Sequence, residues 1–102
     1  MRFTLKQLRY FVVAGELSSV TKAAEALHVS QPSISSAILH LEDVTGLQLF
    51  VRHHAQGLSL TPPGRQFIRK AKQLLGEAEG LAQYANTLGQ DVAGSLRIVG
   101  FP

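Results

Sequence analysis

The sequence predicts a mainly α-helical fold in which three short helices and a β-hairpin precede one long helix. Apolar residues recur with helical spacing in separate segments between residues 5 and 41. Two short apolar runs then flank a polar tip that contains Gly57. Along residues 67–88, apolar residues alternate at steps of four and three, which is the heptad spacing of a long helix that packs against another helix.

The first predicted helix starts after Thr4, whose side chain can cap the helix N-terminus. Gly15 weakens the end of this helix, and Ser18 or Ser19 opens the next one. The apolar face that the helix would bury consists of Leu5, Leu8, Phe11, Val12 and Leu17.

The segment 22–42 predicts two further helices joined by a tight turn. Ala23 and Ala24 give the first of them a narrow face of small side chains, on which another helix can cross closely. Ser30 can accept a hydrogen bond from the start of the second helix, and Pro32 fits its first turn because no N–H is needed there. The buried stripe of the second helix consists of Ile34, Ile38 and Leu41.

The opposite face of this second helix is polar and carries no basic residue near its start. It holds Pro32, Ser33, Ser36, Leu39, His40 and Asp43. A helix pair of this form is typical of a helix-turn-helix, in which the second helix enters the major groove of DNA. Gln31 can pair with adenine, and serine can bond to several base edges or to phosphate. The alternative is an ordinary helical hairpin with a solvated polar face.

Residues 47–61 predict a β-hairpin, since the apolar runs 47–51 and 58–61 flank the polar tip 52–57. Three helices followed by such a hairpin make a winged helix-turn-helix.

The long helix is predicted from Pro62 to about Leu88, after a cap at Thr61. Its heptad stripe consists of Phe67, Ala71, Leu74, Ala78, Leu81, Ala85 and Leu88. A helix of this length would extend roughly 40 Å, more than a small domain can cover. We therefore expect the stripe to form a dimer interface. The alternative is a single amphipathic helix packed on its own domain.

The charge balance is basic in the first part of the chain. Residues 1–75 hold nine Lys and Arg against four acidic residues, whereas residues 76–102 hold one against three. Such an excess suits a surface that faces phosphates. The absence of cysteine excludes disulfides and Cys-ligated zinc. Without a signal peptide, a membrane-spanning run or a catalytic or cofactor motif, we expect a cytoplasmic protein that is not an enzyme and uses no cofactor.

A metal site is the main competing interpretation of the polar residues. His40, His53 and His54 could combine with Glu42 or Asp43, but adjacent residues of a strand point to opposite faces and no third ligand is placed by the spacing. We expect no metal, with the histidines solvated or facing phosphates. For Glu42 we expect a structural role.

In its motifs the chain resembles the N-terminal part of the LysR-type transcriptional regulators. The residues that carry the resemblance are 8–11, 19–24, 29–35, Ile38, 41–42, Gly46, 49–52 and 60–64. The resemblance implies a DNA-binding domain over residues 1–61, a linker and dimerisation helix over 62–89, and a hinge over 90–102. Residues 94–100 resemble the first strand of an effector-binding domain, so the chain is expected to be a piece of a longer protein.

The resemblance also implies the site residues. Those expected at DNA bases or in the groove are Gln31, Pro32, Ser33 and Ser36. Those expected at phosphates are Thr21, Lys22, Ser30, Ser35 and Arg52. The wing is expected to present His53, His54 and Gln56. Many relatives have longer side chains where this sequence has Ser36 and Ala37, and a basic residue near Ala55.

The expected partners are double-stranded DNA and a second copy of the chain. A small-molecule effector would bind only through the missing C-terminal domain, which could also form tetramers. The alternative function is a winged-helix module that binds protein. Such a module would expose more apolar surface on the second helix of the pair, where only Pro32 and Leu39 face outward.

Overall fold

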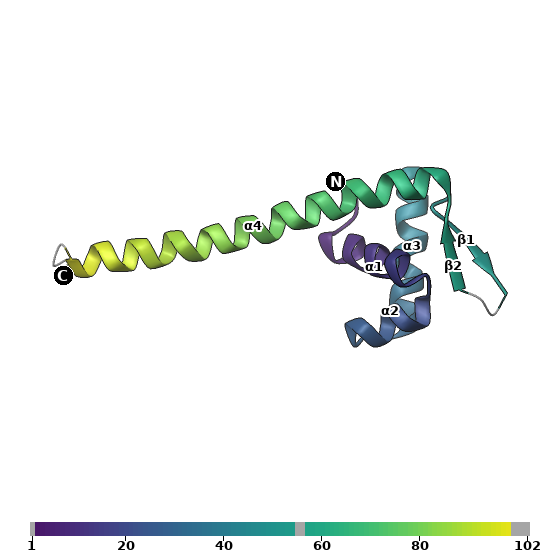
Figure 1. Ribbon diagram of the computed structural model, residues 1–102, viewed down its shortest axis with the longest axis horizontal. Coiled ribbons are helices and arrows are strands. Elements are labelled where there is room, and N and C mark those ends of the chain that lie inside the picture. The colour runs from purple at the N-terminus through teal and green to yellow at the C-terminus, as the bar shows by residue number, and fades with distance from the viewer. Residues whose placement is uncertain (1, 55–56, 99–102) are drawn as a thin grey trace.

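The computed structural model describes residues 2–54 and 57–98. In this part of the chain the elements are α1 (Leu5–Leu17), α2 (Val20–Leu27), α3 (Gln31–Thr45), β1 (Phe50–His53), β2 (Gly57–Leu60) and α4 (Pro62–Ile98). Figure 1 shows α1, α2 and α3 gathered at one end with the hairpin beside them, while α4 extends far beyond this cluster. The predicted winged helix-turn-helix followed by a long helix is confirmed.

Side-chain caps start the three short helices where the sequence predicts them. Thr4 and Gln7 form a reciprocal capping box at α1. The Ser19 side chain accepts a hydrogen bond from the Lys22 N–H, and the Ser30 side chain accepts one from the Ser33 N–H. These bonds satisfy N–H groups that have no partner inside a helix.

The core lies where α1 crosses α3. Phe11 is fully buried, and its ring lies 5.3 Å from that of Phe50 and 5.5 Å from that of Phe67. The predicted stripe of Ile34, Ile38 and Leu41 is fully buried as well. At the two ends of α1, by contrast, Leu5 and Leu17 are 41% and 39% exposed.

The wing consists of β1 and β2 with their connecting residues. The strands are antiparallel, with Phe50 opposite Leu60 and His53 opposite Gly57. The Glu42 carboxylate of α3 accepts hydrogen bonds from the N–H groups of Leu49, at 2.8 Å, and Phe50, at 3.3 Å. Glu42 is therefore structural, as expected, because it ties the start of the wing to α3.

The first turns of α4 belong to the core of the same chain. Ile68, Ala71 and Leu75 are each less than a tenth exposed. At Gly15 of α1 the approach is so close that an added Cβ would lie 2.6 Å from Cδ1 of Ile68. The core therefore extends past the predicted boundary at residue 61 and includes side chains from the first turns of α4. A heptad pattern fixes which residues share a helix face, but not whether its partner is the same chain or another.

The predicted heptad stripe is corrected for the same reason. Ala71 is 4% exposed within one chain, and Phe67 packs on Phe11. Ala71 is therefore buried before any second copy binds, whereas Phe67 is only partly buried. The exposed part of the stripe starts at Leu74.

The end of α4 also differs from the prediction. The helix continues to Ile98, so residues 94–98 are helical here and not the strand that the resemblance implies. A strand needs a neighbour to satisfy its backbone groups, whereas a helix satisfies them internally. Within the described residues the wing is the one sheet, and it pairs only with itself.

Candidate nucleic-acid interface

The start of α3 presents a polar, exposed surface. The predicted base-contacting residues Gln31, Pro32, Ser33 and Ser36 are all exposed. The hydroxyl groups of Ser30 and Ser33 lie 2.8 Å apart, so each is oriented by the other. Ser35 is only half-buried and borders the same end of the helix. The structure thus groups these predicted residues on one accessible surface.

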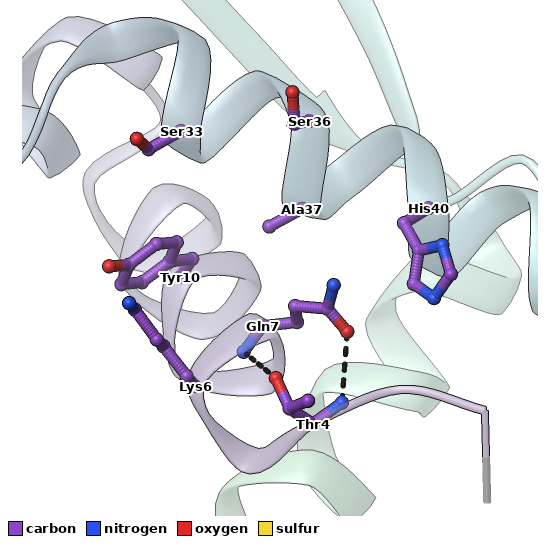
Figure 2. A pocket seen from close by; sticks show the side chains of 8 residues that line it. All are labelled: Thr4, Lys6, Gln7, Tyr10, Ser33, Ser36, Ala37 and His40. Atoms are coloured by element: carbon purple, nitrogen blue, oxygen red, sulfur yellow. Dashed lines mark hydrogen bonds between the residues drawn. The ribbon is translucent and has the colours of Figure 1, made fainter.

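A first groove lies between α1 and α3 and has a volume of about 520 Å³. Figure 2 shows this α1–α3 groove, with Lys6, Gln7 and Tyr10 on one wall and Ser33 and Ser36 on the other. Thr4, Ala37 and His40 complete the lining. Sequence reasoning did not include the α1 residues in the site, because nothing in their spacing relates them to α3.

A second groove of about 360 Å³ lies between the start of α2 and the wing. Thr21 and Arg52, both predicted phosphate contacts, line this α2–wing groove together with His53. The Leu58 N–H donates to the Ser18 carbonyl oxygen at 3.0 Å, which holds the wing against the corner between α1 and α2. Thr21 and Arg52, which are far apart in the sequence, thereby lie on one surface.

The predicted wing residues differ in their surroundings. His53 Nε2 hydrogen-bonds with Ser59 Oγ at 2.7 Å, across the two strands. His54 follows β1 and is exposed, as is Lys22 on α2. Gln56 lies outside the described residues.

The electrostatics of the helix starts favour an anionic partner. None of α1, α2 and α3 has an acidic residue in its first turn. The N-terminal end of a helix carries a partial positive charge, which acidic side chains commonly offset. Here that charge remains available to an external anion such as a phosphate.

A separate exposed apolar surface runs along α4. Leu74, Leu81 and Leu88 are 40%, 68% and 44% exposed. Ala78 is half-buried and Ala85 is exposed. Tyr84, which the heptad stripe did not include, is 59% exposed beside them. These side chains have no cover within the described chain.

The histidine and acidic side chains of residues 2–54 and 57–98 form no group of three that could hold a metal ion. His40 Nε2 instead donates to the Arg2 carbonyl oxygen at 2.6 Å. Among the helices described, none combines the length and the apolar character that crossing a membrane requires.

Comparison with curated proteins finds close relatives among transcriptional regulators. The regulator BsdA of Bacillus subtilis (strain 168) is 35% identical over 94 residues, which are 92% of this chain and 32% of BsdA. CysB of Haemophilus influenzae is 41% identical over 95 residues, 92% of this chain and 29% of CysB. The chain thus spans about a third of the length of these relatives.

Solved structures give the same result for the fold. A crystal structure of a BenM_DBD complex with catB site 1 DNA matches with a TM-score of 0.81 and 34% identity, over 85% of this chain and 97% of that one. A CbnR_DBD–DNA complex matches with a TM-score of 0.80 and 32% identity, over 85% and 99% of the two chains. The family model described as "Bacterial regulatory helix-turn-helix protein, lysR family" matches residues 5–65. The chain therefore belongs to the LysR family of bacterial regulatory helix-turn-helix proteins.

Proposed function

We propose that this chain is the DNA-binding part of a dimeric LysR-type transcriptional regulator that recognises a specific duplex sequence. The observation that carries the proposal is the exposed polar start of α3, which lies in one domain with the α2–wing groove and its Arg52. Two structural relatives of this chain are DNA complexes. The role is binding, without catalysis or a cofactor.

The first part of the mechanism is direct readout by α3 in the major groove. Gln31 can form two hydrogen bonds with adenine, and Ser33 and Ser36 can bond to base edges. Pro32 would contact the groove surface beside them. Because these side chains are uncharged, they supply sequence preference and little of the total affinity.

Phosphate contacts supply the remaining affinity and fix the position of α3. Thr21 and Arg52 face the α2–wing groove, where a backbone phosphate would meet the start of α2. Lys22, Ser30 and Ser35 would bind phosphates nearby. His53, His54 and Gln56 of the wing would follow the adjacent minor groove or backbone.

The second part of the mechanism is dimerisation through the exposed side chains of α4. Leu74, Ala78, Leu81, Ala85 and Leu88 would pack against a second copy. A dimer with two-fold symmetry places two α3 helices on an inverted repeat. Such a regulator acts in the cytoplasm, where bacterial DNA lies.

The rest of the proposed protein lies beyond this chain. We infer that residues 1–61, together with the first turns of α4, bind DNA, and that residues 62–89 form the linker and dimerisation helix. Residues 90–102 would form the hinge and the start of an effector-binding domain. A small-molecule effector would bind there, and tetramers would form there.

Selection of binding sites from a random duplex pool, at two salt concentrations, tests the proposal. We expect recovery of a short inverted repeat whose binding weakens steeply at the higher salt, because binding releases counterions from the DNA. Absence of enrichment from a dimeric protein would contradict sequence-specific binding by this chain, and would favour a winged-helix module that binds protein.

A further inference from the structure

The whole of α3 lacks lysine and arginine. Its fifteen residues include two acids, Glu42 and Asp43, and one histidine, His40. A helix in the major groove lies between two negatively charged phosphate backbones. Because α3 has no lysine or arginine, the basic side chains beside it must come from other elements. Arg52 and Thr21 serve the α2–wing groove. On the α1–α3 groove, Lys6 is the one Lys or Arg among the lining residues.

Lys6 is free to bind an external anion. Within residues 2–54 and 57–98 its ammonium forms no ion pair, whereas Arg9 and Lys72 pair with Glu79 and Glu16. The ammonium lies 5.8 Å from the centre of the Tyr10 ring, at a distance where a cation and an aromatic face attract each other. Figure 2 shows Lys6 extending along Tyr10 at the end of the groove where Ser33 lies. The ring thus favours one orientation of the lysine.

Thr4 and Gln7, on the same wall of the groove as Lys6, are partly engaged with each other. The Thr4 N–H donates to Gln7 Oε1 at 2.9 Å, and the Gln7 N–H donates to Thr4 Oγ1 at 3.1 Å. On the α3 wall, His40 is held by the Arg2 carbonyl oxygen. On the α1 wall of the groove, the donors left for a ligand are the Lys6 ammonium, the Gln7 side-chain N–H₂ and the Tyr10 hydroxyl, since neither of the last two donates a hydrogen bond within the described part of the chain. Of these three, Lys6 alone carries a positive charge.

Within α1, the contact of Lys6 with the Tyr10 ring is favourable, but the charge of Lys6 is badly placed for the helix dipole. Lys6 lies in the first turn, where a positive charge opposes the helix dipole and costs about 0.3–1 kcal/mol at an exposed site. The side chain is exposed. A phosphate beside the Lys6 ammonium would make the positive charge at this position favourable.

We propose that Lys6 binds a DNA backbone phosphate at the edge of the major groove that α3 enters, with Tyr10 holding its ammonium beside Ser33. This inference rests on the proposed function. In this arrangement α1 supplies the positive charge that α3 lacks. The small side chains of Ser36 and Ala37 keep the groove open between the two helices.

The test compares Lys6→Ala, Lys6→Arg and Arg69→Ala with the unaltered chain. Arg69→Ala is the matched control, because it removes the same charge from an exposed position on α4 outside both grooves. Each protein is titrated against a duplex carrying the selected site and against one of scrambled sequence, over a range of salt concentrations.

We expect Lys6→Ala to weaken binding to both duplexes on the order of tenfold, and to lower the slope of log affinity against log salt by about one per protomer. Lys6→Arg should retain affinity and slope, and Arg69→Ala should stay close to the unaltered chain. Equal behaviour of Lys6→Ala and Arg69→Ala would overturn the inference, as would a loss confined to the selected site. If the unaltered chain binds neither duplex, the proposed function itself fails.

Discussion

Arg9 of α1 donates a hydrogen bond to the Glu79 carboxylate of α4 at 2.9 Å, although 70 positions separate them in the sequence. A second ion pair joins Lys72 and Glu16 at 2.8 Å. Arg9 and Glu16 are seven residues apart on α1, and their partners Glu79 and Lys72 are seven residues apart on α4 in the opposite direction. The two pairs therefore match the antiparallel arrangement of these helices.

These ion pairs should contribute little to stability. All four side chains are about half exposed, so water screens the attraction. For Arg9 and Glu79, we expect a double-mutant cycle with alanine to give a coupling of about 0.2–1 kcal/mol in the free energy of unfolding. Urea denaturation of the four proteins measures it. A coupling of several kcal/mol would show that the pair is not exposed in solution.

Two glycines of α4 should respond oppositely to alanine. A Cβ at Gly64 would lie 2.1 Å from the Leu49 carbonyl oxygen, whereas a Cβ at Gly76 meets nothing within 4 Å. Gly64→Ala must push α4 away from the wing and should cost roughly 1–3 kcal/mol, as overpacking does. Gly76→Ala should stabilise by about 0.5–1 kcal/mol through helix propensity. Thermal unfolding compares the two, and a gain in stability for Gly64→Ala would refute the close contact.

Gln31→Ala and Arg52→Ala should separate sequence recognition from phosphate binding. Gln31 is uncharged and exposed at the start of α3, so its loss should cost about 1–3 kcal/mol on the selected site and little on scrambled DNA. Arg52→Ala should weaken both duplexes alike and reduce the salt dependence. Fluorescence anisotropy measures all four affinities. Equal losses on both duplexes for Gln31→Ala would exclude a base contact.

Leu81→Glu should dissociate the proposed dimer. Leu81 is 68% exposed within one chain and lies in the exposed part of the heptad stripe. A carboxylate there would have to lose its water in the interface, at a cost of several kcal/mol. Light scattering reads the mass, and Gln83→Glu, at an exposed position outside the stripe, is the control for charge. An unchanged mass for Leu81→Glu would show that the copies do not meet at this residue.

Local signals in the sequence were sufficient to predict most of the fold. A cap such as Thr4 or Ser30 acts on N–H groups three residues away, and the stripe from Ile34 to Leu41 lies within one helix. For this reason both could be recognised without knowledge of the tertiary structure.

The parts that the sequence did not predict depend on contacts between distant elements. The periodicity of Ala71 is the same whether it faces α1 or a second copy, so only the packed structure assigns it to the core. The membership of Lys6 in the α1–α3 groove likewise follows from how two helices cross. The predicted phosphate contacts of the α2–wing groove came from the resemblance, and the structure adds that Thr21 and Arg52 line one surface.

The close approach of Gly15 to Ile68 is one of the contacts that orient α4 on α1. With 37 residues, α4 is roughly 55 Å long, and its contacts with α1 reach as far as the Arg9–Glu79 ion pair, near the middle of the helix. A small rotation near the start of such a helix produces a larger displacement at its far end. A tilt of one degree at the Gly15 contact moves the far end by about 1 Å over that length. In the proposed dimer, small changes in how α4 packs on α1 would therefore alter the separation of the two DNA-binding domains, and with it the spacing of half-sites that the dimer can span.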